Sequence, residues 1–99
     1  MTLTVRIKPR ARREILALAA WWVSNRTAAR AAVETDLQEA LELLAVFPGI
    51  GTRVENARDA QTRRWLLGRL GHFLYYRQRG NTLEVLACWS TSRESEPKV

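Results

Sequence analysis

Few side chains in this sequence of 99 residues have the types and spacing that catalysis requires. His72 is the only histidine and Cys88 the only cysteine, so a zinc site with ordinary ligand spacing cannot be assembled. Ser90 and Ser92 approach His72 only if the outer strands of a predicted sheet meet, which makes a nucleophilic triad a weak hypothesis. No phosphate-binding loop or dinucleotide fingerprint occurs. We therefore expect neither a metal nor a cofactor.

Metal-free cleavage of RNA is the remaining catalytic option. It needs a base for the 2′-hydroxyl, a cation for the developing phosphorane charge and an acid for the leaving oxygen. The side chains that can supply such groups are Arg64, Arg69, Arg77, Arg93, His72 and Tyr76. Their clustering around one predicted sheet suggests a site, although each arginine taken alone is better explained as a solvated residue on a strand face.

The net charge of +6 is concentrated in residues 1–14 and 53–79, whereas residues 24–47 are acidic overall. A chain of this kind favours an acidic partner, either nucleic acid or an acidic protein segment. The arginines of the first predicted helix lie only in its first turn, so no recognition helix is apparent. We therefore do not expect direct binding to nucleic acid.

The sequence also carries signals that indicate the cellular compartment of the protein. No run of about eighteen apolar residues occurs, and residues 1–14 lack the apolar centre of a secretion signal. A single cysteine cannot form an internal disulfide and suits a reducing cytosol. We expect a cytoplasmic protein with no membrane contact.

Residues 63–93 organise the chain, because their pattern predicts three short strands in an antiparallel meander, about 62–90. Leu83 and Val85 alternate with Thr82 and Glu84, the period that places one set on each face of a strand. Gly80 and Asn81 tolerate the positive φ of a tight hairpin. Gly71 marks the first turn more weakly.

Upstream of the meander, the pattern predicts one strand and two helices. Leu3, Val5 and Ile7 alternate with polar residues, and Pro9 fits the first turn of a helix over Pro9–Ser24. A second helix is predicted over Ala28–Val46, so that the helical hairpin spans about 9–47, and polar residues 52–62 are predicted to form a loop. The fold class is therefore α+β, with the order β-α-α-β-β-β in a single domain over residues 1–99. The N-terminal strand joins the meander in an antiparallel sheet packed on the hairpin.

The first predicted helix is apolar on every side over residues 16–23. Trp21 and Trp22 point about 100° apart on a helix, so they cannot both face the same neighbour. Contiguous exposed apolar area usually marks an interface. We therefore predict a groove on this helix that a partner covers, although one tryptophan can equally be an ordinary exposed aromatic.

Five features in order resemble the RelE/ParE superfamily of toxins over residues 3–93. These are the strand–hairpin–meander order, residues 47–51 (FPGIG), the run from Arg63 to Arg77, the Gly80–Leu86 segment (GNTLEVL) and the terminal Trp89–Arg93 segment (WSTSR). The sequence is most similar to the ParE branch. RelE-like members carry an arginine where Phe73 stands, and no tyrosine or histidine follows Arg93 here. His72 and Ser90 differ from ParE-like members, in which tyrosine and histidine are common at these positions.

The resemblance implies the toxin of a bacterial type II toxin–antitoxin module. It implies a non-enzymatic inhibitor of DNA gyrase that a ParD-like antitoxin neutralises in a hetero-oligomer of 2:2 or larger composition. We predict antitoxin binding by Leu18, Trp21, Trp22, Arg12, Arg13 and Arg64, and target binding by Arg69, Arg77, Trp89 and Arg93. The alternative is a RelE-like, ribosome-dependent mRNA endoribonuclease that uses His72, Arg77 and Arg93.

Overall fold

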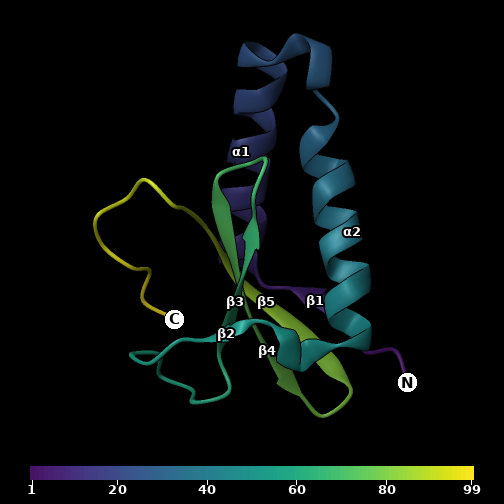
Figure 1. The fold of residues 1–99 in the computed structure, drawn as a ribbon, viewed down its shortest axis with the longest axis vertical. Helices are drawn as coiled ribbons and strands as arrows, with labels where there is room; N and C mark the ends of the chain where they lie inside the picture. Colours follow the sequence, from purple (N-terminus) through teal and green to yellow (C-terminus); the bar gives the residue numbers. More distant parts are fainter.

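The computed structural model describes all residues, 1–99, as two helices packed on one face of a five-stranded sheet (Figure 1). The elements are β1 (Thr4–Ile7), α1 (Pro9–Asn25), a 3₁₀ turn η1 (Thr27–Ala29), α2 (Ala32–Val46), a second 3₁₀ turn η2 (Pro48–Ile50), β2 (Thr52–Arg53), β3 (Arg63–Leu67), β4 (His72–Arg79) and β5 (Thr82–Ser90). The α+β class and the predicted order of elements are confirmed. Neither α-helix has the length and apolar character that a membrane span requires.

The sheet has the order β1-β5-β4-β3-β2, and its last three long strands form the predicted meander. The two hairpin glycines adopt the positive φ that their turns require, 63° at Gly71 and 55° at Gly80. The sheet is mixed, because β1 pairs in parallel with β5, with Thr4 opposite Thr82 and Ile7 opposite Val85. Alternation of side chains is the same in both directions, so the sequence pattern could not decide that β1 is parallel rather than antiparallel.

Two further details differ from the sequence prediction. Helix α2 begins at Ala32 instead of Ala28, because the chain first makes the η1 turn and no side chain caps the helix at Ala31. The predicted loop 52–62 contributes the short strand β2, which pairs with β3 at its far edge. Both differences concern short segments whose hydrogen bonding depends on neighbours that local sequence does not specify.

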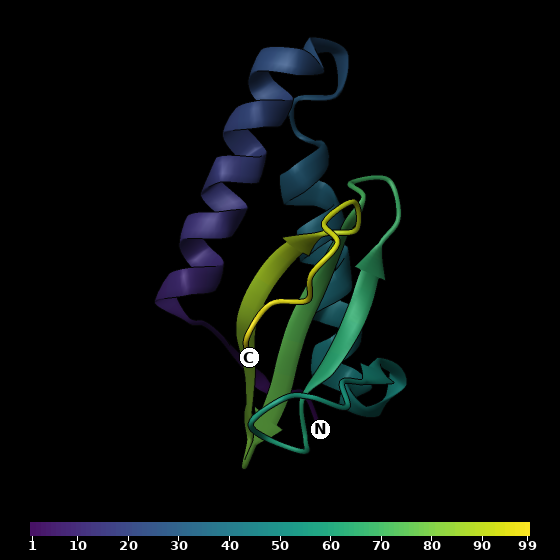
Figure 2. The ribbon, with the colours of Figure 1, turned by 90° about the vertical axis from the view of Figure 1, so that its left-hand side faces the viewer.

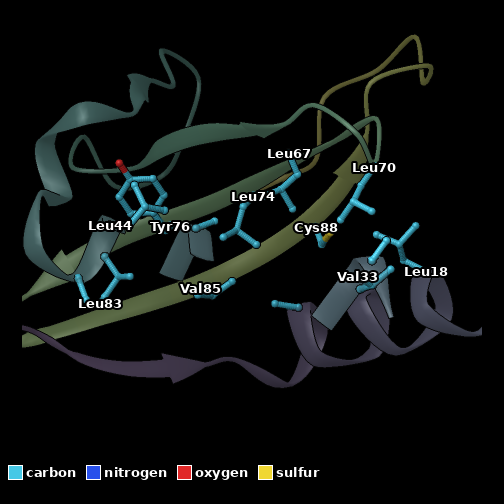
Figure 3. Packing of buried hydrophobic residues seen from close by; sticks show 14 of the residues in the cluster. Leu18, Val33, Leu44, Leu67, Leu70, Leu74, Tyr76, Leu83, Val85 and Cys88 are labelled. Atoms are coloured by element: carbon cyan, nitrogen blue, oxygen red, sulfur yellow. The ribbon is translucent and has the colours of Figure 1, made fainter. Parts of the chain in front are cut away.

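Burial along α1 separates the two tryptophans as the helical spacing predicts. The side chain of Trp22 is 8% exposed and packs in the core, whereas that of Trp21 is 48% exposed. Figure 3 shows Leu18 of α1 close to Leu70 of the β3–β4 turn and to Cys88 of β5, at one end of the core. The other end of the core contains Leu44 and Tyr76. The face of α1 that carries Leu18 and Trp22 therefore packs against the sheet.

Tyr76 connects this core to the segment that ends α2. Its hydroxyl donates a hydrogen bond to the Pro48 carbonyl oxygen (2.8 Å) and accepts one from the Gly51 N–H (2.9 Å). Burial raises the pKa of Tyr76, although the Gly51 hydrogen bond acts in the opposite direction. Gly51 has to be glycine, because a Cβ there would lie 2.3 Å from the Tyr76 hydroxyl oxygen and 2.8 Å from the Arg64 carbonyl oxygen.

The C-terminal segment after β5 returns across the face of the sheet opposite the helices (Figure 2). Its backbone is held at three points. Trp89 Nε1 donates to the Ser95 carbonyl oxygen (2.8 Å), Arg10 donates to the Lys98 carbonyl oxygen (2.6 Å), and the Arg58 N–H donates to the Val99 carbonyl oxygen (2.8 Å). Pro97 is buried. This segment therefore covers part of the sheet face that the helices leave open.

Candidate functional site

A groove of about 770 Å³ lies between α1 and the C-terminal end of β5. One wall is the face of α1 that runs from Glu14 to Trp22. The other is formed by the turn between β3 and β4 together with the end of β5 and residues 90–93. The groove exists because β1 pairs with only the first half of β5, through Val85, while α1 continues alongside the second half.

The α1 wall is apolar. Leu18 and Trp22 reach the groove from the core, and the half-exposed Trp21 contacts the Trp22 ring edge-to-face with centroids 6.1 Å apart. Such edge-to-face pairs are favoured by the ring quadrupoles. Leu18, Trp21 and Trp22, which were predicted to form a groove, therefore line one groove in the structure. Only Trp21 has enough exposed area to lose to a partner, however, because the other two are already largely buried.

Two arginines at the groove are free to meet an acidic partner. The Arg26 guanidinium lies over the Trp21 ring at 5.4 Å, and that of Arg93 lies over the Trp89 ring at 4.0 Å. Neither forms an ion pair within the chain. Arg69 also lines the groove, but it makes a forked ion pair with Asp36 of α2, and that hydrogen bonding raises the pKa of Arg69. Arg26 and Arg93 thus supply the uncompensated charge.

The floor of the groove contains the reactive residue types without a reactive arrangement. The β4–β5 register places His72 opposite Ser90, but the Ser90 hydroxyl is hydrogen bonded to that of Ser92 (2.8 Å). His72 Nδ1 is 2.9 Å from the Leu70 carbonyl oxygen, so this nitrogen carries a proton and donates it there. Neither serine hydroxyl therefore has a histidine as its hydrogen-bond acceptor, and the nucleophilic triad is not assembled.

Cys88, also in the floor, is held as a neutral thiol. Burial raises the pKa of Cys88 to about 12, and the nearby Glu14 carboxylate adds to the shift. Glu14 reaches this point because its Oε1 accepts a hydrogen bond from the Cys88 backbone N–H at 3.0 Å. Its Oε2 faces Arg10 at 3.5 Å. A thiol in this state is a poor nucleophile and a poor metal ligand.

The remaining predicted residues lie elsewhere. Arg77 is on the opposite face of the sheet, where its Nε donates to Glu84 at 2.8 Å and its Nη1 is 3.6 Å from Asp59. Its hydrogen bond lowers the pKa of Glu84, so both charges are compensated within the chain. Arg64 and Trp89 are also on that face. Arg64 stacks on Phe73 at 4.2 Å and faces Glu96 at 3.7 Å.

Arg12 and Arg13 are exposed on the first turns of α1 and do not line the groove. The predicted set is therefore divided among three places. The residues that line the groove are Leu18, Trp21, Trp22, Arg69, His72 and Arg93. Those on the opposite face of the sheet are Arg64, Arg77 and Trp89. The two helix arginines, Arg12 and Arg13, lie at neither place.

Sequence reasoning missed two of the charged residues that line the groove, Glu14 and Arg26. Glu14 is the only acid before Glu34, set among five basic residues, and that isolation is a usable signal for a specific contact. Arg26 follows the apolar helix directly, where a cation can meet both the helix C-terminus and an exposed aromatic ring.

Comparison with solved structures confirms the fold. The chain is similar to a structure described as the chromosomal ParDE toxin–antitoxin system from P. aeruginosa, with a TM-score of 0.72 and 19% identity over 90% of this chain and 96% of that one. It is also similar to the YoeB dimer from Staphylococcus aureus, with a TM-score of 0.60 and 16% identity over 90% and 97% of the two chains. The protein is therefore of the small α+β class that these structures share.

The sequence model of the family described as the ParE toxin of the type II toxin–antitoxin system parDE matches residues 5–95. The chain belongs to this family. No match is found among curated proteins.

Proposed function

We propose that this protein is the toxin of a parDE-type module, that a ParD-like antitoxin binds it at the groove beside α1, and that it inhibits DNA gyrase by binding rather than by breaking bonds. Family membership carries the first part of the proposal. The groove geometry supports the second, and the dispersal of the candidate catalytic residues supports the third.

The groove has the composition of a docking site for an amphipathic acidic segment. Trp21 offers exposed aromatic area next to the buried Trp22, and aromatic anchors of this type dominate binding energies at protein interfaces. Arg26 and Arg93 lie without acidic partners at the groove, so carboxylates of a partner would meet unpaired positive charge. Complementary charge of this kind accelerates association and selects the partner.

A ribonuclease mechanism requires acid, base and cation to act on one phosphate. His72 and Arg93 line the groove, but Arg77 is five residues further along β4, about 16 Å away, and on the opposite face. Its guanidinium is also engaged by two carboxylates. His72, the only histidine, donates through Nδ1 to a backbone carbonyl. This separation favours inhibition by binding over the alternative of mRNA cleavage.

Arg93 belongs to the predicted target-binding set, together with Trp89, on whose ring it stacks. It also lines the groove in which we propose that the antitoxin binds. A segment bound in the groove would therefore contact a side chain that the target needs. We propose this overlap as the physical basis of neutralisation, with antitoxin and gyrase competing for Arg93.

The test is a DNA supercoiling assay with purified gyrase, run beside cleavage of ribosome-bound mRNA. We expect inhibition of supercoiling, relief by the antitoxin encoded beside this protein, and intact mRNA. Arg93→Ala should weaken both gyrase inhibition and antitoxin binding by about tenfold. Arg30→Ala removes the same charge from an exposed site outside the groove and serves as the matched control. Cut mRNA together with unaffected gyrase would overturn the proposal in favour of the ribonuclease.

A further inference from the structure

The second half of β5 has one free edge. Strand β5 continues to Ser90, but its parallel partner β1 ends at Ile7, opposite Val85. Beyond that point the chain leaves the sheet at Pro9 and enters α1. Residues 87–90 therefore pair with β4 on one side, while Leu86 is the unpaired residue of a β-bulge. No strand pairs with residues 86–90 on the other side. At about 3.3 Å per residue, the open edge is roughly 17 Å long.

The open edge borders the groove. Cys88 directs its backbone N–H away from β4, because that N–H is bonded to the Glu14 carboxylate. Hydrogen bonding alternates along an antiparallel strand, so Ser90 directs its N–H to the same side. The Ser90 carbonyl oxygen already accepts a hydrogen bond from the Arg93 N–H at 3.4 Å. Cys88 and Ser90 both line the groove, opposite Leu18 and Trp21 of α1. One wall of the groove is thus a strand edge and the other is an apolar helix face.

Glu14 acts here as a substitute for a missing strand. Its carboxylate accepts from the Cys88 N–H, one of the two N–H groups that a further strand would otherwise bind, and charged side chains are a common way to protect an exposed edge. A partner strand can displace the Glu14 carboxylate from the Cys88 N–H, because Arg10, 3.5 Å from Oε2, still stabilises the negative charge of Glu14. An unpaired edge with a removable cover is a template for strand addition.

We infer that an extended segment of a partner protein adds to β5 along residues 86–90 and displaces Glu14 from the Cys88 N–H. The segment alternates apolar and acidic residues. Its apolar side chains face Trp21, and its carboxylates meet Arg93 and Arg26. This inference rests on the proposed function, because the segment would belong to the antitoxin that occupies the same groove.

Charge selects this occupant over others. The cations at the groove that lack an acidic partner are Arg26 and Arg93, and the only carboxylate lining it is that of Glu14, which Arg10 partly compensates. A second copy of this chain, with a net charge of +6, would bring like charge to the site. An acidic segment completes the charge balance while its backbone completes the sheet.

The test uses a capped seven-residue peptide of alternating valine and glutamate, with the full-length protein. The matched control is the same peptide carrying N-methyl groups on alternate amides, on the edge that faces β5, which keeps its charge but cannot pair as a strand. We expect the methylated peptide to bind at least about tenfold more weakly. Hydrogen exchange at the Cys88 and Ser90 amides should slow only with the unmethylated peptide. Equal affinity of the two peptides, or no binding of either, would overturn the inference.

Variants of the protein locate the contact. Ser90→Pro removes the N–H of the open edge without removing a ladder bond to β4, whereas Ser90→Ala retains the N–H and controls for the lost hydroxyl. We expect about tenfold weaker peptide binding for the proline variant alone. Glu14→Ala should strengthen binding several-fold by freeing Cys88, and Glu14→Gln should give less of this gain because its amide oxygen still covers the N–H. Circular dichroism of each variant serves as the check that it is folded.

The experiments can refute the strand-addition inference and the proposed function independently of each other. If the antitoxin encoded beside this protein binds, and Arg93→Ala weakens it while Ser90→Pro does not, strand addition is wrong and the proposed function stands. If the peptide adds as a strand but gyrase is unaffected, the edge is a docking site and the gyrase target is wrong.

Discussion

Removing the hydroxyl of Tyr76 is expected to destabilise the fold far more than removing that of its neighbour Tyr75. Both side chains are 1% exposed, so the two Tyr→Phe changes alter burial equally. The Tyr76 hydroxyl joins the Pro48 carbonyl to the Gly51 N–H, at 2.8 and 2.9 Å. The Tyr75 hydroxyl makes no hydrogen bond within the chain and is not enclosed.

The size of the expected destabilisation follows from the backbone groups that Tyr76→Phe leaves without a hydrogen-bond partner. Tyr76→Phe loses two hydrogen bonds, each with a net value of about 1 kcal/mol, and strands a buried N–H whose desolvation costs about 1–3 kcal/mol. Partial relaxation of the η2 turn lets the Pro48 carbonyl reach water. We expect a loss of about 2–3 kcal/mol in the free energy of unfolding, which for a domain of this size lowers Tm by roughly 10–20 °C.

The assay is urea unfolding followed by tryptophan fluorescence and by circular dichroism. The midpoint should fall for Tyr76→Phe with an unchanged m-value, because the surface exposed on unfolding is nearly the same. Tyr75→Phe should stay within about 0.5 kcal/mol of the parent protein. Equal destabilisation by the two changes would refute the assignment of this cost to the Pro48–Gly51 hydrogen bonds.

Three further outcomes are expected. Gly51→Ala should destabilise by about 2 kcal/mol or more, because its Cβ would collide with Tyr76 and with backbone, while Gly49→Ala, with no atom within 4 Å of its Cβ, should change the urea midpoint little. Trp22→Ala should cost about 3–5 kcal/mol of stability. Trp21→Ala should cost under about 1 kcal/mol of stability, yet weaken antitoxin binding in calorimetry by about tenfold or more. A larger loss of stability for Trp21→Ala than for Trp22→Ala would contradict the burial argument. Cys88 should resist iodoacetamide at pH 8 in the native state and react fast in urea, since its raised pKa of about 12 leaves almost no thiolate; rapid native labelling would show that the thiol is accessible.

The proposed competition of antitoxin and target for Arg93 has a consequence for how the protein would be regulated. Arg93 follows β5 directly and stacks on Trp89, while the C-terminal segment beyond it is hydrogen bonded to the same indole through Ser95. Binding at the groove can therefore alter the sheet face opposite the helices through one short stretch of chain. Reciprocal competition between the two partners is the expected outcome of such coupling.

The sequence by itself determined the elements and their faces. Period-two alternation located β5, glycines marked both hairpins, and helical spacing separated Trp21 from Trp22. These features depend on local geometry, which side-chain periodicity records directly. The ordered motifs were enough to indicate the family, and the family assignment is confirmed.

Only the tertiary structure decided which residues meet. Arg77 and Arg93 look alike in the sequence, yet one is paired with two carboxylates on the opposite face and the other stands uncompensated at the groove. The direction of β1 and the contact of Glu14 with Cys88, 74 residues apart, were equally hidden. Whether a charge is free or paired depends on long-range neighbours, and no local pattern encodes those neighbours.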